Sequence, residues 1–137
     1  MNGSQGSQDL GKAVLRIVLG LLILLHGISK LINGPGFVTQ MVTQAGYPPA
    51  LAYLVYIGEV VAPVLLILGI WARLGAVIVV VNMLVAISLV HTKQLGMLAD
   101  TGGWALELQG MYLAGALAVA LLGAGRLSVG GIGGRWN

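Results

Sequence analysis

YIGEVVAPVLLILGIWARLG, residues 56–75, decides the fold, because it is long and apolar enough to cross a membrane yet carries a carboxylate. Glu59 lies well inside the apolar run, and Arg73 closes it. A charged side chain inside a bilayer-length segment costs about 2.5–3.5 kcal/mol on insertion scales, so such a residue usually has a partner or a task. The surroundings of Glu59 therefore bear directly on function.

The composition around this stretch is that of a membrane protein. Of the 137 residues, 58% are hydrophobic and only 8% are charged, whereas a soluble domain carries about a quarter charged residues. The sequence contains no cysteine, which excludes disulfides, thiolate metal sites, dithiol exchange and c-type haem attachment within it. The net charge of +3 is small, and nothing in its distribution predicts a nucleic-acid partner. We predict one integral membrane domain in contact with the lipid bilayer.

Four apolar segments are each close to the ~20 residues that cross a hydrocarbon core. Because the backbone must satisfy its own hydrogen bonds within lipid, they predict an all-α bundle of four transmembrane helices. Their ranges are 12–32, 50–70, 74–91 and 104–123.

The flanking segments are polar or rich in glycine. Residues 1–11 predict a disordered tail, and they lack the basic region of a signal peptide. Residues 12–128 would then form the transmembrane domain, followed by a flexible tail over 129–137.

The connection between the first two predicted spans is long and uncharged. Its apolar residues share one face at helical spacing, which predicts a short interfacial helix ended by Gly46, before Pro48 and Pro49 open the second span. The residues of that face are Phe37, Val38, Met41 and Val42.

Lysine and arginine set the expected orientation. Five of them lie on the side of the membrane that holds both termini, and two lie on the other side. An excess of positive charge marks the cytoplasmic side, so we predict cytoplasmic termini and a multi-pass protein of the bacterial inner membrane. The five are Lys12, Arg16, Arg73, Arg126 and Arg135, and the two are Lys30 and Lys93.

In this orientation, seven side chains with acid, base or phenol groups fall in the outer half of the bundle, from all four spans. They are His26, Lys30, Tyr56, Glu59, His91, Glu107 and Tyr112. At ~1.5 Å per residue, His26 would lie roughly 10 Å and Glu59 roughly 13–14 Å below the outer surface.

Two interpretations of this cluster stay open. One is a functional polar pocket. The other is pairing that holds the helices together, Glu59 with Lys30 or His26 and Glu107 with Lys93 or His91. Asn82, in the middle of the third span, is expected to form a hydrogen bond between helices. Pro63 is expected to kink the second span beside the cluster.

Metal and haem chemistry find little support in the sequence. Two histidines on different helices, His26 and His91, could ligate a haem, but their predicted depths match poorly and a haem is disfavoured. No metal site is predicted, because thiolates and closely spaced histidines are lacking.

Glu59, with a histidine and a lysine nearby, could exchange protons with a quinone or quinol that enters from lipid. The alternative function is non-catalytic: a helical bundle that binds a partner protein or stabilises a membrane complex. No catalytic residue is assigned by either hypothesis.

An ordered set of short motifs runs along the chain. HGxxKL occupies positions 26–31, and a Gly-Glu pair at 58–59 precedes the Arg-Leu pair at 73–74. MLVAI, GGWALEL and LLGAGRLS follow at positions 83–87, 102–108 and 121–128. In order and spacing, residues 12–130 resemble the DoxX-like family of small bacterial four-helix membrane proteins.

The resemblance implies a redox setting without fixing a reaction. Some relatives are linked to quinone-dependent sulfur oxidation as subunits of a thiosulfate:quinone oxidoreductase, and others to quinone or oxidative-stress resistance or to membrane oxidoreductase complexes. The chain would then be a subunit linked to quinone oxidoreduction, with a membrane oxidoreductase or a second copy of itself as partner. The matching positions are His26, Lys30, Glu59, Arg73, His91, Glu107 and Arg126.

Overall fold

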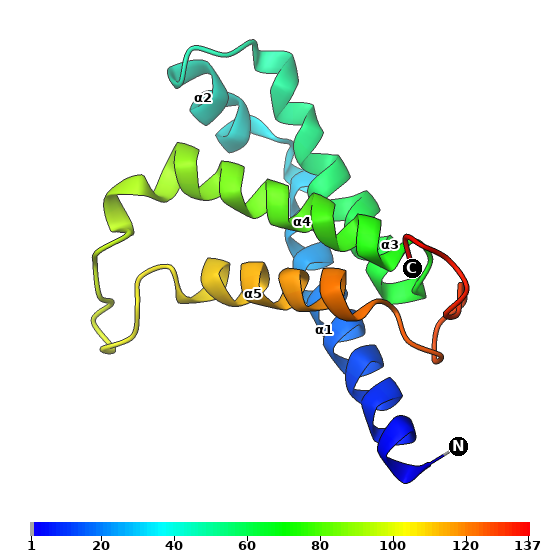
Figure 1. The fold of residues 1–137 in the computed structure, drawn as a ribbon. Coiled ribbons are helices and arrows are strands. Elements are labelled where there is room, and N and C mark those ends of the chain that lie inside the picture. The colour runs from blue at the N-terminus through cyan, green and yellow to red at the C-terminus, as the bar shows by residue number, and fades with distance from the viewer. Residues whose placement is uncertain (1) are drawn as a thin grey trace.

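Helix α1, Gly3–Asn33, is the longest element, and the other helices cross it or run beside it (Figure 1). The computed structural model describes residues 2–137. The helix begins nine residues before the predicted start of the first span, so residues 3–11 belong to α1 and not to an irregular tail. Met1 lies outside the described residues.

The second predicted span is built from three consecutive helical pieces. A 3₁₀ helix η1, Pro49–Leu54, is followed by a π-helical turn η2, Ile57–Val61, and by α3, Ala62–Leu68. Pro49 stands at its start, as predicted, because proline lacks the N–H that a first helical turn leaves unused.

The third span repeats this irregularity at its far end. Helix α4, Ala72–Ala86, passes into a second π-helical turn, η3, Ile87–His91, and a short 3₁₀ helix, η4, Thr92–Gln94. Helix α5, Glu107–Leu122, completes the bundle. Within residues 2–137 the only strand-like feature is the isolated bridge between Leu98 and Trp104, so the all-α prediction is confirmed.

Three helical stretches are long and apolar enough to cross a membrane: Gly3–Asn33, Pro49–Leu68 and Ala72–Gln94. Helix α5 is apolar but shorter, with 16 residues. It begins three residues later than predicted, because Trp104 is held in the preceding loop, where its indole N–H donates to the Leu95 carbonyl at 2.9 Å. These lengths and compositions indicate a multi-pass membrane protein.

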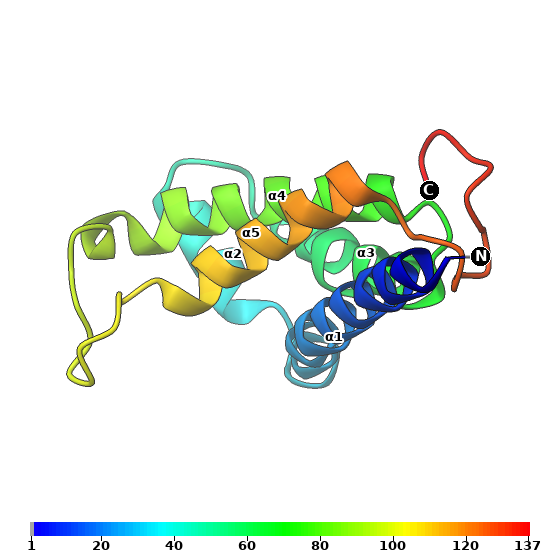
Figure 2. The same ribbon diagram turned by 60° about the horizontal axis from the view of Figure 1, so that its bottom comes forward.

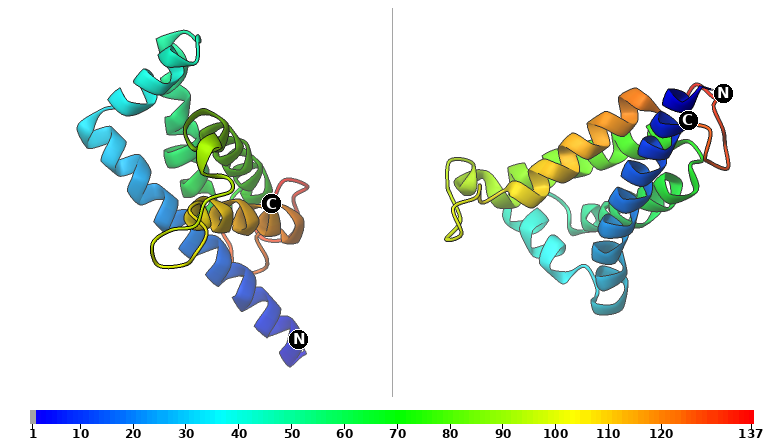
Figure 3. Two further views of the ribbon diagram at one scale, coloured as in Figure 1. Left: turned by 90° about the vertical axis from the view of Figure 1, so that its left-hand side faces the viewer. Right: turned by 90° about the horizontal axis from the view of Figure 1, so that it is seen from below.

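The helices pack in a ring in the order α1, α3, α4, α5 and back to α1. Figure 2 shows α4 and α5 side by side, and Figure 3 shows how α1 crosses beneath them. Small residues allow the close approach of α1 to α3, since a Cβ on Gly20 would lie 2.9 Å from the Pro63 carbonyl oxygen. The core is aliphatic around Ile23, Leu66 and Val79.

The end of the bundle that holds the termini is fastened by two arginines. Arg16, predicted to lie at the interface, is instead only 1% exposed. Its guanidinium donates to the carbonyls of Leu66 and Ile67 at 2.8 Å and to that of Leu127 at 2.6 Å. Leu66 and Ile67 lie in the last turn of α3, where carbonyls have no partner within the helix and attract cations, which explains the burial.

Arg73 binds the carbonyls at the C-terminal end of α5 in the same way. Its guanidinium donates to the carbonyls of Ala120 and Leu121 at 2.8 and 2.9 Å. Each arginine therefore joins its own helix to the C-terminal end of a neighbour.

The segment 129–137 contains no helix, yet it is packed against the start of α4. The Trp136 carbonyl accepts from the Arg73 amide at 2.9 Å, and the Asn137 side chain accepts from the Ala72 amide at 3.0 Å. These bonds satisfy the first N–H groups of α4, which have no partner inside the helix. Asn137 is 6% exposed.

Helix α2, Gly36–Gln44, forms where a short helix was predicted between the first two spans. It is followed by Gly46, whose φ of 87° suits a residue without a Cβ. Its position at a membrane interface stays a prediction.

Candidate functional site

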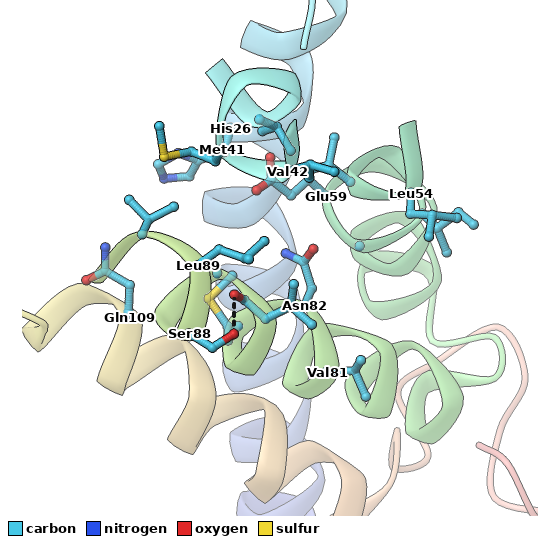
Figure 4. A pocket seen from close by; sticks show the side chains of 18 of the residues that line it. His26, Met41, Val42, Leu54, Glu59, Val81, Asn82, Ser88, Leu89 and Gln109 are labelled. Atoms are coloured by element: carbon cyan, nitrogen blue, oxygen red, sulfur yellow. Dashed lines mark hydrogen bonds between the residues drawn. The ribbon is translucent and has the colours of Figure 1, made fainter. Parts of the chain in front are cut away.

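A cavity of about 810 Å³ opens between α1, α2, the second and third spans and α5 (Figure 4). This volume lies within the range of small-molecule sites. Most of the wall is apolar, and α2 contributes the predicted apolar face with Phe37, Val38, Met41 and Val42. Five of the seven predicted site residues line the cavity: His26, Lys30, Glu59, His91 and Tyr112.

The charged feature of the wall is an ion pair between α1 and η2. The Lys30 ammonium donates to a Glu59 carboxylate oxygen at 2.6 Å, with side chains 23% and 12% exposed respectively. The predicted pairing of Glu59 with Lys30 is therefore present. Because both groups also face the cavity, the structural and functional interpretations are compatible with each other.

Local backbone geometry places Glu59 against α1. Pro63 has no N–H to offer the Glu59 carbonyl four residues earlier, and the chain forms the π-helical turn η2 immediately before it. The Ala62 amide donates to the Ile57 carbonyl, five residues back. A Cβ on Gly27 would lie 2.7 Å from the Glu59 carbonyl carbon, so only glycine permits this approach.

Tyr56 supports the ion pair from outside the cavity. Its hydroxyl donates to the Lys30 backbone carbonyl at 2.9 Å, which ties the end of α1 to the second span. Tyr56 is thus a neighbour of the site and not part of its lining.

His26 and Tyr112 stand edge to face, with ring centroids 6.1 Å apart. Both line the main cavity and also a smaller hollow of about 290 Å³, whose other lining residues are Leu22, Leu25 and Ser29. Since Leu22 and Leu25 are exposed, this hollow lies on the outer surface of α1. The two rings therefore lie between the cavity and the apolar exterior.

His91 contributes a second polar group on the wall. Its Nδ1 lies 2.7 Å from Gln94 Oε1, and its Nε2 lies 3.4 Å from Gln109 Nε2. A neutral ring that carries its proton on Nδ1 satisfies both contacts, donating to Gln94 and accepting from Gln109. Gln109, absent from the predicted site, reaches the cavity from α5 (Figure 4).

Glu107 does not join the site. It is exposed at the first turn of α5, where its carboxylate lies over Gly103, and it does not line the cavity. The ion pairs among residues 2–137 are Lys30–Glu59 and a longer contact between Arg126 and Asp9, so the predicted pairing of Glu107 with Lys93 or His91 is wrong. An acidic residue in a first helical turn is already stabilised by the helix N-terminus.

The prediction for Asn82, a hydrogen bond between helices, is also wrong. Instead of bonding to another helix, its amide makes no hydrogen bond to any residue from 2 to 137. It packs over Gly58, where an added Cβ would lie 2.6 Å from Asn82 Oδ1, and it lines the cavity on the side of Glu59 (Figure 4). The sequence feature that singled out Asn82 was its place as a polar residue in the middle of an apolar span.

No group of three or more histidine, cysteine, aspartate or glutamate side chains that could hold a metal ion is found in the described part of the chain. The functional groups on the cavity wall are thus an ammonium, a carboxylate, two phenols, two imidazoles, a hydroxyl and amides. Such a set can form hydrogen bonds and exchange protons with a bound molecule.

Two comparisons with known proteins found similar sequences. The family model named DoxX matches residues 11–92. A Bacillus subtilis protein named "Putative oxidoreductase CatD" is 29% identical over 87 residues, which cover 64% of this chain and 64% of that protein. No solved structure matches the chain significantly. The match of the family model to more than half of its residues shows that the chain belongs to the DoxX family.

Proposed function

We propose that this protein is a redox-associated subunit of the bacterial inner membrane that binds a quinone-like molecule in the cavity. The observation that carries the proposal is the Lys30–Glu59 ion pair on the wall of a mostly apolar cavity of about 810 Å³. An apolar ring that bears polar oxygens needs this combination, in which the wall accepts the ring and a few polar groups orient the oxygens.

The ion pair suits the chemistry of such a ligand. When a quinone becomes a quinol it takes up a pair of electrons and a pair of protons, and the electrons would come from a partner oxidoreductase. Lys30 can donate a hydrogen bond to a carbonyl oxygen of the quinone, and Glu59 holds the ammonium in place. In the reverse reaction, when a quinol gives its electrons to the partner, Glu59 can accept a proton from a quinol hydroxyl. The name of the Bacillus subtilis relative supports a redox role.

The His26–Tyr112 pair supports entry from lipid. These rings line both the cavity and the hollow on the outer surface of α1. A hydrophobic ligand dissolved in the membrane would then enter between the rings without crossing water. The aromatic edge-to-face contact is worth about 0.5–1.5 kcal/mol beyond the area it buries, so it can open at modest cost.

Orientation is part of the proposal. Both termini face the cytoplasm and the cavity lies nearer the outer surface, since five of the seven lysines and arginines lie on the side of the termini. Because the sequence has no cysteine, a thiol introduced as Phe37→Cys reports the side directly. Reaction with a reagent confined to the cytoplasmic side alone would overturn this orientation.

Ligand binding is tested on protein purified in its native lipid. Mass spectrometry should detect a co-purified quinone, and an added decyl-substituted benzoquinone should raise the melting temperature. The Lys30→Met variant should bind this probe roughly ten-fold more weakly, because it loses a charge-assisted hydrogen bond. The matched variant Lys93→Met, at an exposed lysine, should bind like the wild type.

A second pair of variants separates chemistry from scaffolding. Glu59→Gln and Glu107→Gln make the same change inside and outside the cavity. A folded Glu59→Gln protein with weakened binding supports the proposal. If no quinone co-purifies, none added shifts the melting temperature, and a stable partner protein is recovered instead, the non-catalytic scaffold is the correct function.

A further inference from the structure

We infer that Asn82 is the residue that recognises an oxygen atom of the ligand, and that it does so in both the oxidised and the reduced form of a quinone-like molecule. The inference rests on the proposed function and adds a residue and a ligand chemistry to it. Three observations carry it: the place of the amide, its lack of a partner, and its combination of donor and acceptor.

The amide lies in the middle of the third span, where Asn82 is half-buried and lines the cavity. A polar group in apolar surroundings is stabilised when a ligand supplies the hydrogen bond that the protein does not. Within residues 2–137, the neighbouring polar side chains are bonded elsewhere: Glu59 with Lys30, and Ser88 with the Val85 carbonyl. Asn82 differs from these two residues in that neither its donor nor its acceptor has a partner among residues 2–137, so both are available to the cavity.

The packing of Gly58 shows that the amide is held in place. An added Cβ at Gly58 would lie 2.6 Å from Asn82 Oδ1 and 2.7 Å from its Cβ, so the side chain rests directly on the π-helical turn. Figure 4 shows the amide rising from α4 toward the part of the cavity where Glu59 lies. A side chain fixed against backbone presents its polar atoms with little loss of rotamer freedom on binding.

The chemistry of the amide differs from that of the ion pair. An ammonium only donates hydrogen bonds and an ionised carboxylate only accepts them, whereas an amide does both. Asn82 can donate from Nδ2 to a quinone carbonyl and accept at Oδ1 from a quinol hydroxyl. A residue with both capacities keeps the ring in one position while its oxygen changes from acceptor to donor.

The test uses Asn82→Leu, a substitution of similar size that removes the polar atoms. Ser88→Ala is the matched control, because Ser88 also lines the cavity but its hydroxyl is already bonded to its own helix at 2.8 Å. Each protein is titrated in lipid nanodiscs with a decyl-substituted benzoquinone, with its quinol, and with decylbenzene, which has no oxygen atoms.

We expect Asn82→Leu to bind the quinone and the quinol roughly ten-fold more weakly and decylbenzene as tightly as the wild type does. The ligand-free variant should melt at a higher temperature, because an unpartnered amide has been replaced by an apolar group. Ser88→Ala should match the wild type with all three probes.

The outcomes separate this inference from the proposed function. If the wild type binds neither quinone nor quinol, the proposed function fails. If the wild type binds both and Asn82→Leu binds them equally well, Asn82 has no role in recognition and this inference is wrong. A ligand-free Asn82→Leu protein that melts at a lower temperature would instead identify the amide as a structural contact.

A second variant, Asn82→Ala, distinguishes lost hydrogen bonding from steric blockage, because it leaves space where leucine adds bulk. It should also bind both the quinone and the quinol more weakly than the wild type does.

Discussion

Replacing Gly27 by alanine tests whether the contact between α1 and the second span sets the geometry of the site. The new Cβ would lie 2.7 Å from the Glu59 carbonyl carbon and 2.9 Å from Val60 Cγ2. Ordinary contacts begin near 3.4 Å, so the two helices must separate by at least about 0.7 Å. The obstructing atoms include backbone, which cannot rotate away as a flexible side chain does.

The expected magnitude follows from opposing effects. Alanine in place of glycine inside a helix stabilises by about 1 kcal/mol, and overpacking of a close interface destabilises by about 1–3 kcal/mol. Because backbone is involved, we take the upper value of about 3 kcal/mol for overpacking. Less the gain of about 1 kcal/mol from helix propensity, Gly27→Ala should lower the free energy of unfolding by about 2 kcal/mol. Lys30 lies three residues further along α1, so its 2.6 Å contact with Glu59 should lengthen too.

Gly11 provides the control within the same helix. A Cβ there meets nothing within 4 Å, so Gly11→Ala should gain up to about 1 kcal/mol from helix propensity alone. The free energies of unfolding are measured by circular dichroism as the protein is titrated with a denaturing detergent in mixed micelles. The reasoning would be refuted if Gly27→Ala were as stable as Gly11→Ala, because the close approach would then not exist.

Further predictions concern the ion pair and the end of the bundle that holds the termini. Arg16→Met should lower the free energy of unfolding by about 3 kcal/mol in the same titration, because it removes charged donors from buried carbonyls. Asn137→Ala should lower it by about 1 kcal/mol and speed hydrogen exchange at the Ala72 amide, which loses its cap. Lys30→Met should destabilise the protein more than the double variant Lys30→Met/Glu59→Gln does, because the single change leaves a carboxylate without its partner.

Controls and contrary outcomes are available for each of these changes. Arg126→Met, at a side chain 47% exposed and 4.0 Å from Asp9, should alter stability by no more than about 1 kcal/mol. Equal losses for Arg16→Met and Arg126→Met would contradict the role given to the buried guanidinium. Unchanged exchange at Ala72 in Asn137→Ala would show that the cap does not protect the helix. A double variant less stable than Lys30→Met would mean that the two residues do not act as a pair.

The sequence by itself determined the class of the protein and the composition of its site. Apolar segments of membrane-spanning length can only be helices, and their alternating direction brings the end of the first, the start of the second, the end of the third and the start of the fourth to one level. Most of the predicted residues, among them Lys30, Glu59 and Tyr112, therefore line one cavity. Periodicity likewise predicted α2, whose apolar face contributes to the wall.

Tertiary structure decided which of the possible partners each polar group has. Depth along a helix follows from counting residues, but rotation about the helix axis and the approach of backbones depend on packing. Packing turns Arg16 into the bundle, leaves Glu107 outside it, and presses Asn82 onto Gly58 without a bond. The π-helical turns at Glu59 and His91 shift the face that each residue presents, which a regular helical period does not predict.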